Sequence, residues 1–218
     1  LEDRTTTLIG KRRLAAKKDP RASYQNRRRE ICDAAVRVFH RKGFKAASLT
    51  GVAAELGVDR AMIYYYFSSK DQLFDEIVRT VLEGNAALAL RIADSAISPP
   101  RKLRELISAF MISYAKHYPL LYLYIREDLS HVNDTRAAWS DHMRDLNRSI
   151  EKSVIDIVEQ GLADGSFRRT GSAKNIAYAV LGMLNWSHRW YKPGKSDPPE
   201  ELGKTFAEIV ISGLESVY

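Results

Sequence analysis

Residues 48–70, SLTGVAAELGVDRAMIYYYFSSK, decide how the rest of the chain is interpreted. Ser48 is a favourable N-cap, and apolar residues follow it at helical spacing. Gly57 supplies the left-handed conformation that ends many helices, and a second short helix is expected from about Asp59 to Phe67. Two short helices joined by a glycine turn form a helix-turn-helix, whose second helix enters the major groove of DNA. The stretch therefore predicts a DNA-reading unit.

The composition is that of a globular protein with one or two domains. The chain has 218 residues, 45% of them hydrophobic, which is enough for a sizeable core. No apolar run reaches the roughly 18 residues of a membrane span, and the start lacks the apolar segment of a secretory signal. Cys32 is the only cysteine, which excludes an internal disulfide and fits a reducing cytoplasm. We therefore expect a cytoplasmic protein without a membrane partner.

The positive charge gathers in front of the predicted DNA reader. Residues 1–29 hold ten basic and three acidic side chains, and this excess equals the net charge of +7 of the whole chain. A solvated charge run is one interpretation of such a segment. Phosphate contact is the favoured one, because the segment adjoins the reader and Arg27 and Arg28 lie in the first turns of a predicted helix, where the helix dipole does not favour cations.

The chain order predicts a basic arm and two domains. Residues 1–22 have no periodicity and are expected to form a flexible arm. A helix over 23–42, ended by a glycine, precedes the helix-turn-helix, so the first domain is placed at 23–70. A capping box at Ser69 and Gln72 then opens a helix to about Ala93. This helix leads into a second domain, 71–218, without a flexible linker.

The remaining segments also have helical patterns and no convincing strand. Prolines, Asn133 and Ser172 mark helix starts, and Gly165 and Gly194 mark turns. The further helices are expected at 99–118, 120–129, 133–163, 173–191 and 199–217. The fold class is therefore all-α, with about nine helices in total.

No catalytic or metal-binding motif is found in the sequence. There is no phosphate-binding glycine loop and no HExxH, CxxC or GxSxG pattern. The five histidines are scattered over different segments, so no metal site and no cofactor are expected. Cys32 lies among apolar helix positions and is interpreted as a small core residue. We expect a protein that is not an enzyme.

The helix-turn-helix carries side chains suited to DNA. Arg60 can donate to guanine, Ala61 can contact a thymine methyl group, and tyrosine hydroxyls can reach bases or phosphates. Some of the tyrosines could instead belong to the core, as Ile63 and Phe67 are expected to do. The predicted DNA contacts are Ser48, Thr50, Arg60, Ala61, Tyr64, Tyr65, Tyr66 and Lys70, together with Arg27 and Arg28.

Residues 31–74 resemble the N-terminal domain of the tetracycline-repressor (TetR) family of transcriptional regulators. The matching pieces are AAVRVFHRKGFKAASL, VAAELGV and IYYYFSSKDQLF, in order and without gaps, over about a fifth of the chain. By position, the resemblance implies DNA contacts from Thr50, Arg60, Ala61, Tyr64, Tyr65 and Lys70, with Tyr66 at the DNA backbone. Gly51 departs from the family pattern, which more often has a polar or charged residue there. The basic arm is also longer than is usual.

In that family the C-terminal domain is helical, binds a ligand and dimerises through its last two helices. Here these would be residues 173–191 and 199–217, which are apolar on more than one face and so need two partners, the core and a second subunit. A singly buried helix is the alternative. The segment NWSHRWYKPG (185–194) resembles regulators of fatty-acid or other acyl-coenzyme A catabolism, which suggests a similar effector.

The effector pocket is expected to use large apolar and aromatic residues between the linking helix and the dimer face. These candidates are Phe110, Met111, Tyr114, Tyr118, Tyr122, Trp139, Met143, Tyr178, Met183 and Trp186, each of which could also be an ordinary core residue. The sequence predicts a homodimeric, ligand-responsive repressor that binds a double-stranded DNA operator and is released by a small apolar effector. An architectural DNA-binding protein without an effector, or a helical enzyme, is the alternative.

Overall fold

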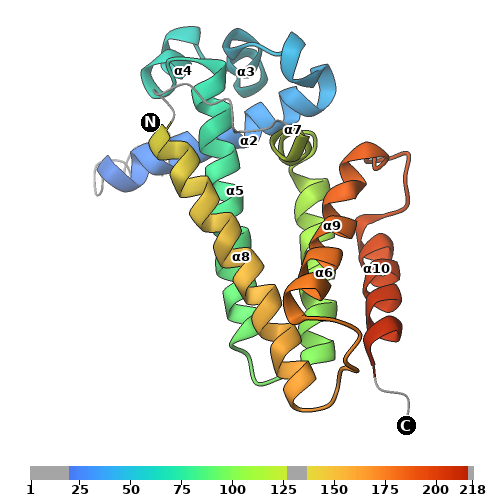
Figure 1. Cartoon of the computed structure of the whole chain (residues 1–218). Helices are drawn as coiled ribbons and strands as arrows, with labels where there is room; N and C mark the ends of the chain where they lie inside the picture. The colour runs from blue at the N-terminus through green and yellow to red at the C-terminus, as the bar shows by residue number, and fades with distance from the viewer. Residues whose placement is uncertain (1–19, 127–136, 216–218) are drawn as a thin grey trace, which may run out of the picture. The chain divides into compact units, whose positions relative to one another are not determined.

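The chain is all-α, as the sequence predicts. The computed structural model describes residues 20–126 and 137–215, and these form nine α-helices and one short 3-10 helix (Figure 1). In this part of the chain, strand-like pairing is limited to one bridge between Phe167 and Glu215. Most of the predicted basic arm and the predicted helix cap at 133–134 lie outside the described residues.

The first compact unit ends at Phe74 and holds three helices before the long α5 begins. They are α2 (Pro20–Ala46), α3 (Leu49–Leu56) and α4 (Arg60–Tyr66). The side chains that they bury include Ile31, Ala34, Ala35, Val38, Phe39, Val52, Ile63 and Phe67. Cys32, by contrast, is only half-buried. This is the arrangement of a three-helix unit that contains a helix-turn-helix.

Helix α2 extends beyond its predicted bounds at both ends. It begins at Pro20 instead of near Ser23, because proline is well suited to the first turn of a helix. Gly43 takes a non-helical conformation (φ 74°, ψ 156°) and ends the regular helix where the sequence predicts, and a further helical turn after this break continues to Ala46. A glycine marks this kink because positive φ is strained for other residues.

The local caps of the helix-turn-helix form where the sequence predicts them. The Ser48 hydroxyl accepts a backbone N–H of the first turn of α3 at 3.1 Å, and Gly57 takes a left-handed conformation (φ 65°) at its end. The Ser69 hydroxyl accepts the N–H of Gln72 at 3.0 Å. The Gln72 side chain, however, accepts the N–H of Ser68 at 2.7 Å, so the reciprocal bond of the capping box is displaced by one residue.

The second compact unit begins at Asp75, inside α5 (Lys70–Ala93). Its other helices are α6 (Pro99–Lys116), α7 (Leu120–Arg126), α8 (Ala137–Ala163), α9 (Ala173–Trp186) and α10 (Pro199–Leu214). Helix α10 packs along α6, and α8 packs against α6 and α9 (Figure 1). None of the helices in the described ranges is long and apolar enough to cross a membrane.

Three helices of this unit end earlier than the sequence predicts, among them α10, which ends at Leu214 and not at residue 217. Helix α6 ends at Lys116 and not at Tyr118. Helix α9 ends at Trp186, five residues before its predicted end, and is followed by a 3-10 turn over Ser187–Arg189. A side-chain hydrogen bond accompanies this early end of α9: the Ser187 hydroxyl donates to the Leu184 carbonyl oxygen at 2.7 Å.

Candidate DNA-reading and effector sites

Helix α4 is short and mostly exposed. Its N-cap, Asp59, accepts the N–H of Ala61 at 3.1 Å, which fixes the first turn. Ile63 is the only one of its seven residues that is buried. The helix therefore rests on one fully buried side chain, and most of its other residues are exposed.

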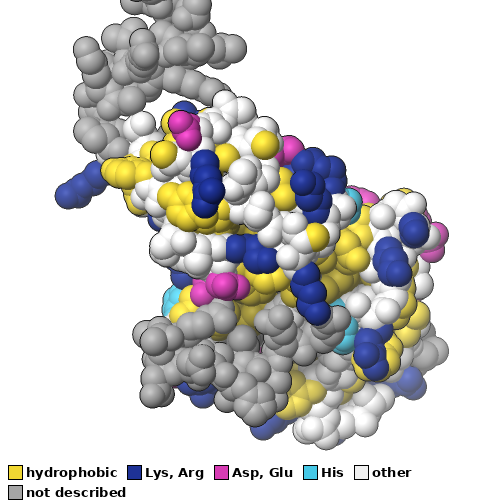
Figure 2. Space-filling model, turned by 90° about the horizontal axis from the view of Figure 1, so that it is seen from above, with side chains coloured by type: hydrophobic (Ala, Val, Ile, Leu, Met, Phe, Trp, Pro, Cys, Tyr) yellow, Lys and Arg dark blue, Asp and Glu magenta, His cyan; other side chains and the backbone are white. Residues whose placement is uncertain are grey.

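Most of the exposed side chains of α4 are predicted DNA contacts, and Met62 is exposed beside them. Tyr65 is 73% exposed and Tyr64 43%, and Arg60 and Ala61 are also exposed. The Arg60 guanidinium donates to the Tyr64 hydroxyl at 3.1 Å and lies 4.9 Å from the centre of its ring. Figure 2 shows Lys and Arg side chains spread among exposed hydrophobic ones on one face of the molecule. Such a mixed surface suits both phosphates and base edges.

Two other predicted contacts, Tyr66 and Ser48, already interact within the unit. Tyr66 is half-buried, its ring lies 4.8 Å from that of Tyr24, and burial raises the pKa of its hydroxyl. Ser48 is exposed, but its hydroxyl is already bonded as a helix cap; Thr50, two residues on, is also exposed. A role of Tyr66 or Ser48 at DNA remains a prediction.

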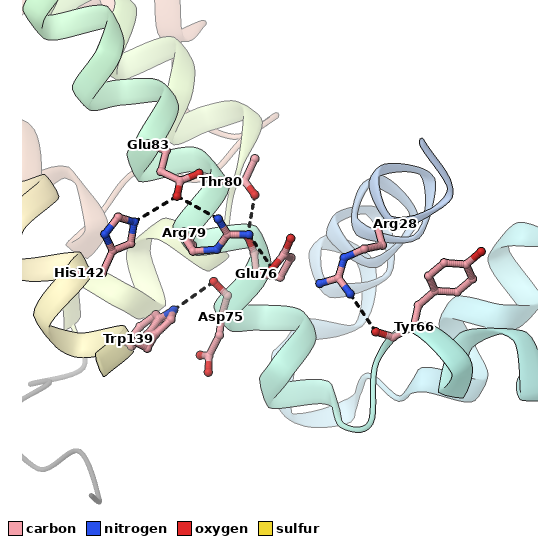
Figure 3. A network of polar contacts seen from close by, with 9 residues as sticks. All are labelled: Arg28, Tyr66, Asp75, Glu76, Arg79, Thr80, Glu83, Trp139 and His142. Carbon is pink, nitrogen blue, oxygen red and sulfur yellow. Dashed lines mark hydrogen bonds and ion pairs between the residues drawn. The ribbon is translucent and has the colours of Figure 1, made fainter. Parts of the chain in front are cut away.

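Three cations that the sequence assigns to phosphate have bonds within the unit. Arg27 forms an ion pair with Glu30 in the same helix at 2.6 Å. Arg28 donates to the Tyr66 carbonyl oxygen at 3.1 Å (Figure 3). The Lys70 ammonium donates to the carbonyl oxygen of Phe44 at 2.8 Å, at the end of α2. Their contacts with phosphate stay predictions, and the structure adds these internal roles.

An ion-pair cluster that the sequence reasoning missed joins α2 to α3. Arg37 donates to Glu55 at 2.8 Å, and Arg41 bonds the other carboxylate oxygen of the same residue. The two guanidinium groups, Arg41 more strongly, lower the pKa of Glu55 to about 2. Arg37 and Arg41 are separated by four residues on a helix, which was the available signal, but their partner lies on another helix.

The second unit contains a cluster of aromatic side chains around α6 and α7. The ring of Tyr122 lies 5.8 Å from Tyr114, 5.6 Å from Tyr118 and 6.2 Å from Tyr191, in edge-to-face contacts. Phe110 stacks on Tyr114 at 6.4 Å. The structure thus brings together four of the predicted effector residues and adds Tyr191, which the sequence reasoning missed.

The hydroxyl groups of this cluster are bonded to the end of α9 and the turn after it. Tyr114 donates to the Asn185 side chain at 2.7 Å, and the Tyr122 hydroxyl lies 3.0 Å from that of Ser187. Burial raises the pKa of Tyr122 to about 12 and that of Tyr114 further, so both stay protonated. Asn185 and Ser187 were missed although they belong to the quoted segment 185–194.

Helix α8 contributes a second group of predicted effector residues. Met143, like Met111 on α6, is fully buried, and Trp139 is half-buried with its ring 6.2 Å from Tyr124. Next to Trp139, Ser140 is 3% exposed, and its hydroxyl has no hydrogen-bond partner among the described residues. A buried polar group of this kind is costly unless something else bonds it.

The predicted effector residues of α9 lie elsewhere. Tyr178 is 44% exposed and Trp186 57%, whereas Met183 is half-buried. Tyr178 and Trp186 are more exposed than the residues of an inner pocket would be. They belong to an apolar face of α9 that the described residues leave uncovered. Trp190 and, on α10, Ile209 are also exposed.

A polar network joins α5 to α8 (Figure 3). The indole N–H of Trp139 donates to the Asp75 carbonyl oxygen at 3.3 Å. His142 lies 3.1 Å from Glu83, which also accepts from Arg79 at 2.9 Å. These bonds fasten α8 to the part of α5 that directly follows the first unit.

An open pocket of about 750 Å³ lies where the α5–α6 connection meets the end of α8. None of the ten predicted effector residues lines it. Its buried Lys102 donates to the Ala93 carbonyl and to the Gln160 side chain, both at 2.7 Å, and so caps the end of α5. In the described part of the chain, no group of three His, Cys, Asp or Glu side chains is arranged to hold a metal ion.

Two family models match the chain. One, described as the tetracyclin repressor-like C-terminal domain, matches residues 96–214, which are more than half of the chain. The other, described as bacterial regulatory proteins of the tetR family, matches residues 31–77 and thus includes the whole helix-turn-helix.

Curated relatives and solved structures agree with these matches. The transcriptional repressor KstR2 of Mycolicibacterium smegmatis is 29% identical over 190 residues, 87% of this chain and 91% of that protein. The transcriptional repressor NicS of Pseudomonas putida is 31% identical over 153 residues, 68% of this chain and 69% of that protein. The crystal structure of the TetR-family regulator PfmR from Thermus thermophilus is similar with a TM-score of 0.71 and 26% identity, covering 85% of this chain and 99% of that one. The chain therefore belongs to the TetR family of bacterial regulatory proteins and is a DNA-binding transcriptional regulator.

Proposed function

We propose that a small apolar, acyl-bearing effector bound in the second unit releases a homodimer of this repressor from its operator. The protein acts by binding alone and catalyses no reaction. One observation carries the switch: α5 runs as one helix from Lys70, in the first unit, to Ala93, in the second. A change in how α5 is held in the second unit therefore changes the helix that leads directly from the DNA reader.

The network between α5 and α8 supports this coupling. Trp139 and His142 bond α5 at two places about two turns apart, at Asp75 and Glu83. The two residues share α8 with Met143 and with the unpaired hydroxyl of Ser140, which are candidates for effector contact. An effector that bonds Ser140 and displaces neighbouring side chains would change the position of α8, and with it the hold on α5.

The chemistry of the buried cluster supports an apolar effector with a few polar groups. Tyr114 and Tyr122 combine aromatic faces with protonated hydroxyls, and Phe110 and Met111 supply apolar surface. This mixture suits an elongated acyl chain next to a carbonyl group. The resemblance of segment 185–194 to regulators of acyl-coenzyme A catabolism agrees, since that segment supplies Asn185 and Ser187 to the cluster.

The proposed DNA contacts are the exposed side chains of the helix-turn-helix, Thr50, Arg60, Ala61, Tyr64 and Tyr65. The variant Arg60→Ala is expected to lose about 1–3 kcal/mol of binding at one base pair. Operator DNA for this test is obtained by selecting duplexes from a random library with the full-length protein. The matched control is Arg101→Ala, which removes an exposed arginine of α6 and is expected to leave binding unchanged. Equal weakening on every sequence would make Arg60 a phosphate contact instead.

The uncovered apolar face of α9 and α10 supports a homodimer through these helices. Ile209 is 61% exposed on α10, and an isolated subunit would leave it in water together with Trp186 and Trp190. Ile209→Asp is expected to shift the protein toward monomer in analytical ultracentrifugation. Leu90→Asp is the control, because Leu90 is 51% exposed on α5, outside this face. If both variants sediment as the wild type does, dimerisation through α9 and α10 is refuted.

The effector is tested by mass spectrometry of ligand retained by the purified protein, followed by titration. We expect palmitoyl-coenzyme A to weaken binding to the selected duplex by about 5- to 150-fold, the usual range of allosteric coupling. Palmitate and coenzyme A alone are the comparison arms. Tyr122→Phe removes a buried hydroxyl and should weaken the response, while Tyr178→Phe removes an exposed one and should not. If DNA affinity is the same with and without every ligand tested and retained, the switch is wrong.

A further inference from the structure

Helix α4 is held at its amino end, at its middle and at its carboxyl end, where the fully buried Phe67 follows its last residue. Asp59 caps the start of the helix and Ile63 is buried at its middle. A helix of seven residues is not stable alone, so its direction depends on contacts at its ends. The last carbonyl groups have no partner inside a helix and need one outside it.

Arg28 of α2 supplies this partner. Its guanidinium donates to the carbonyl oxygen of Tyr66, the last residue of α4, at 3.1 Å across 38 residues of sequence (Figure 3). A cation at the end of a helix is also favoured by the helix dipole. The same group lies 4.4 Å from the ring centre of Phe67, which is fully buried. Arg28 is thus held by a backbone atom and by a core ring.

Tyr24, one turn before Arg28, completes the contact. Its ring lies 4.8 Å from that of Tyr66 and 6.2 Å from that of Tyr65, and the Arg28 guanidinium is 5.9 Å from it. Residues four apart lie on the same face of a helix, so one face of α2 meets the end of α4. The ring of Tyr24 therefore packs against that of Tyr65, which is itself 73% exposed, and helps to position it.

The neighbouring arginines of α2 differ from Arg28. Arg27 pairs with Glu30, and the exposed Arg29 donates to Asn26, both within α2. Arg28 is half-buried and reaches another helix. The three consecutive cations therefore cannot be treated as one phosphate-binding cluster.

We propose that Arg28, with Tyr24, is a positioning residue that fixes the carboxyl end of α4 and thereby the specificity of DNA reading, and is not a phosphate contact. A planar guanidinium presents several N–H donors in a fixed fork and can stack its flat face on a ring, whereas an ammonium group is a compact point charge. The inference rests on the DNA-reading role proposed for α4. In this role, Arg28 affects which DNA sequence is bound and does not add to the electrostatic attraction to DNA.

The test uses the full-length protein, a duplex selected from random DNA by the wild type, and a scrambled duplex of the same composition. Binding to both is measured over a series of salt concentrations. Arg28→Ala is expected to weaken binding to the selected duplex by about tenfold and to leave the scrambled duplex within about twofold. The slope of log affinity against log salt should stay unchanged. Arg29→Ala, which removes the same charge one residue away, should leave the ratio of the affinities for the two duplexes unchanged.

A loss of slope of about 0.9 for each phosphate contact, with both duplexes weakened equally, would overturn the proposal. If circular dichroism shows that Arg28→Ala does not fold, Tyr24→Ala, which leaves the net charge unchanged, is used instead. Tyr24→Ala should lower the ratio of the affinities for the selected and the scrambled duplex without changing the salt slope. An unchanged ratio would refute the role of the contact between α2 and the end of α4. A wild type that selects no sequence would instead contradict the reading role of α4 itself.

Discussion

Gly203 offers a test of the packing that supports the proposed dimer face. It lies inside α10, which carries the exposed Ile209, and it is buried against α6. A Cβ atom at Gly203 would lie 2.8 Å from the Cα atom of Ser108, which is backbone and cannot rotate away. The variant is Gly203→Ala, and the control is Gly84→Ala in α5, where a Cβ atom would meet nothing within 4 Å.

The expected difference follows from two opposing effects. Alanine is better than glycine inside a helix by about 1 kcal/mol, and both variants gain this. Carbon atoms pack at about 3.5–4.0 Å, so at Gly203 the helices must separate by roughly 1 Å. Overpacking of this kind costs about 1–3 kcal/mol. Because the helix gain is common to both variants, their difference in the free energy of unfolding is this cost, with Gly203→Ala the less stable.

The assay is thermal unfolding followed by circular dichroism at one protein concentration, since a dimer melts in a concentration-dependent way. For a chain of this size, about 1–3 kcal/mol corresponds to roughly 2–12 °C between the two variants. Sedimentation of Gly203→Ala should show a larger monomer fraction, because the face that carries Ile209 moves. Equal melting temperatures, or a higher one for Gly203→Ala, would refute the close packing of α10 on α6.

Two further predictions concern a carboxylate and a hydroxyl. The folded pKa of Glu55 is about 2, below its ordinary 4.5, so its contribution to stability is present above pH 4.5 and is lost as the pH falls toward 2. Glu55→Gln should therefore flatten the acid part of the unfolding profile in this window, and an unchanged profile would contradict the ion pairs. Ser140→Ala removes a buried unpaired hydroxyl and should raise the free energy of unfolding by about 1 kcal/mol while weakening retention of the effector. A drop in melting temperature would show that the hydroxyl is bonded.

The parts of the fold that local chemistry decides could be predicted from the sequence. Ser48 and Gly57 bound α3 because a cap depends on residues within one turn. The buried positions of Ile63 and Phe67 follow from helical spacing in the same way. Helix ends were less predictable where tertiary contacts compete, as at Trp186, where bonds of the following turn end α9 early.

The roles of individual side chains could be predicted less well. Arg28 and Lys70 were expected at phosphate, but the carbonyls that they bond lie 38 and 26 residues away in the sequence. No local pattern contains such a pair. Tyr178 and Trp186 show the same limit, because a helix that is apolar on two faces does not state which face meets the core and which meets a second subunit.

Part of the positive charge of the first unit is therefore used to hold the unit together. Arg28 and Lys70 bond backbone carbonyls, and Arg37 and Arg41 share Glu55. A cation that must leave such a bond to reach phosphate gains less by doing so, so the number of cations overstates the number of phosphate contacts. Each phosphate that is neutralised adds about 0.9 to the salt dependence of binding. If the slope of log affinity against log salt corresponds to one phosphate contact for every cation, these internal bonds open on DNA. A clearly smaller slope is what a preformed reader implies.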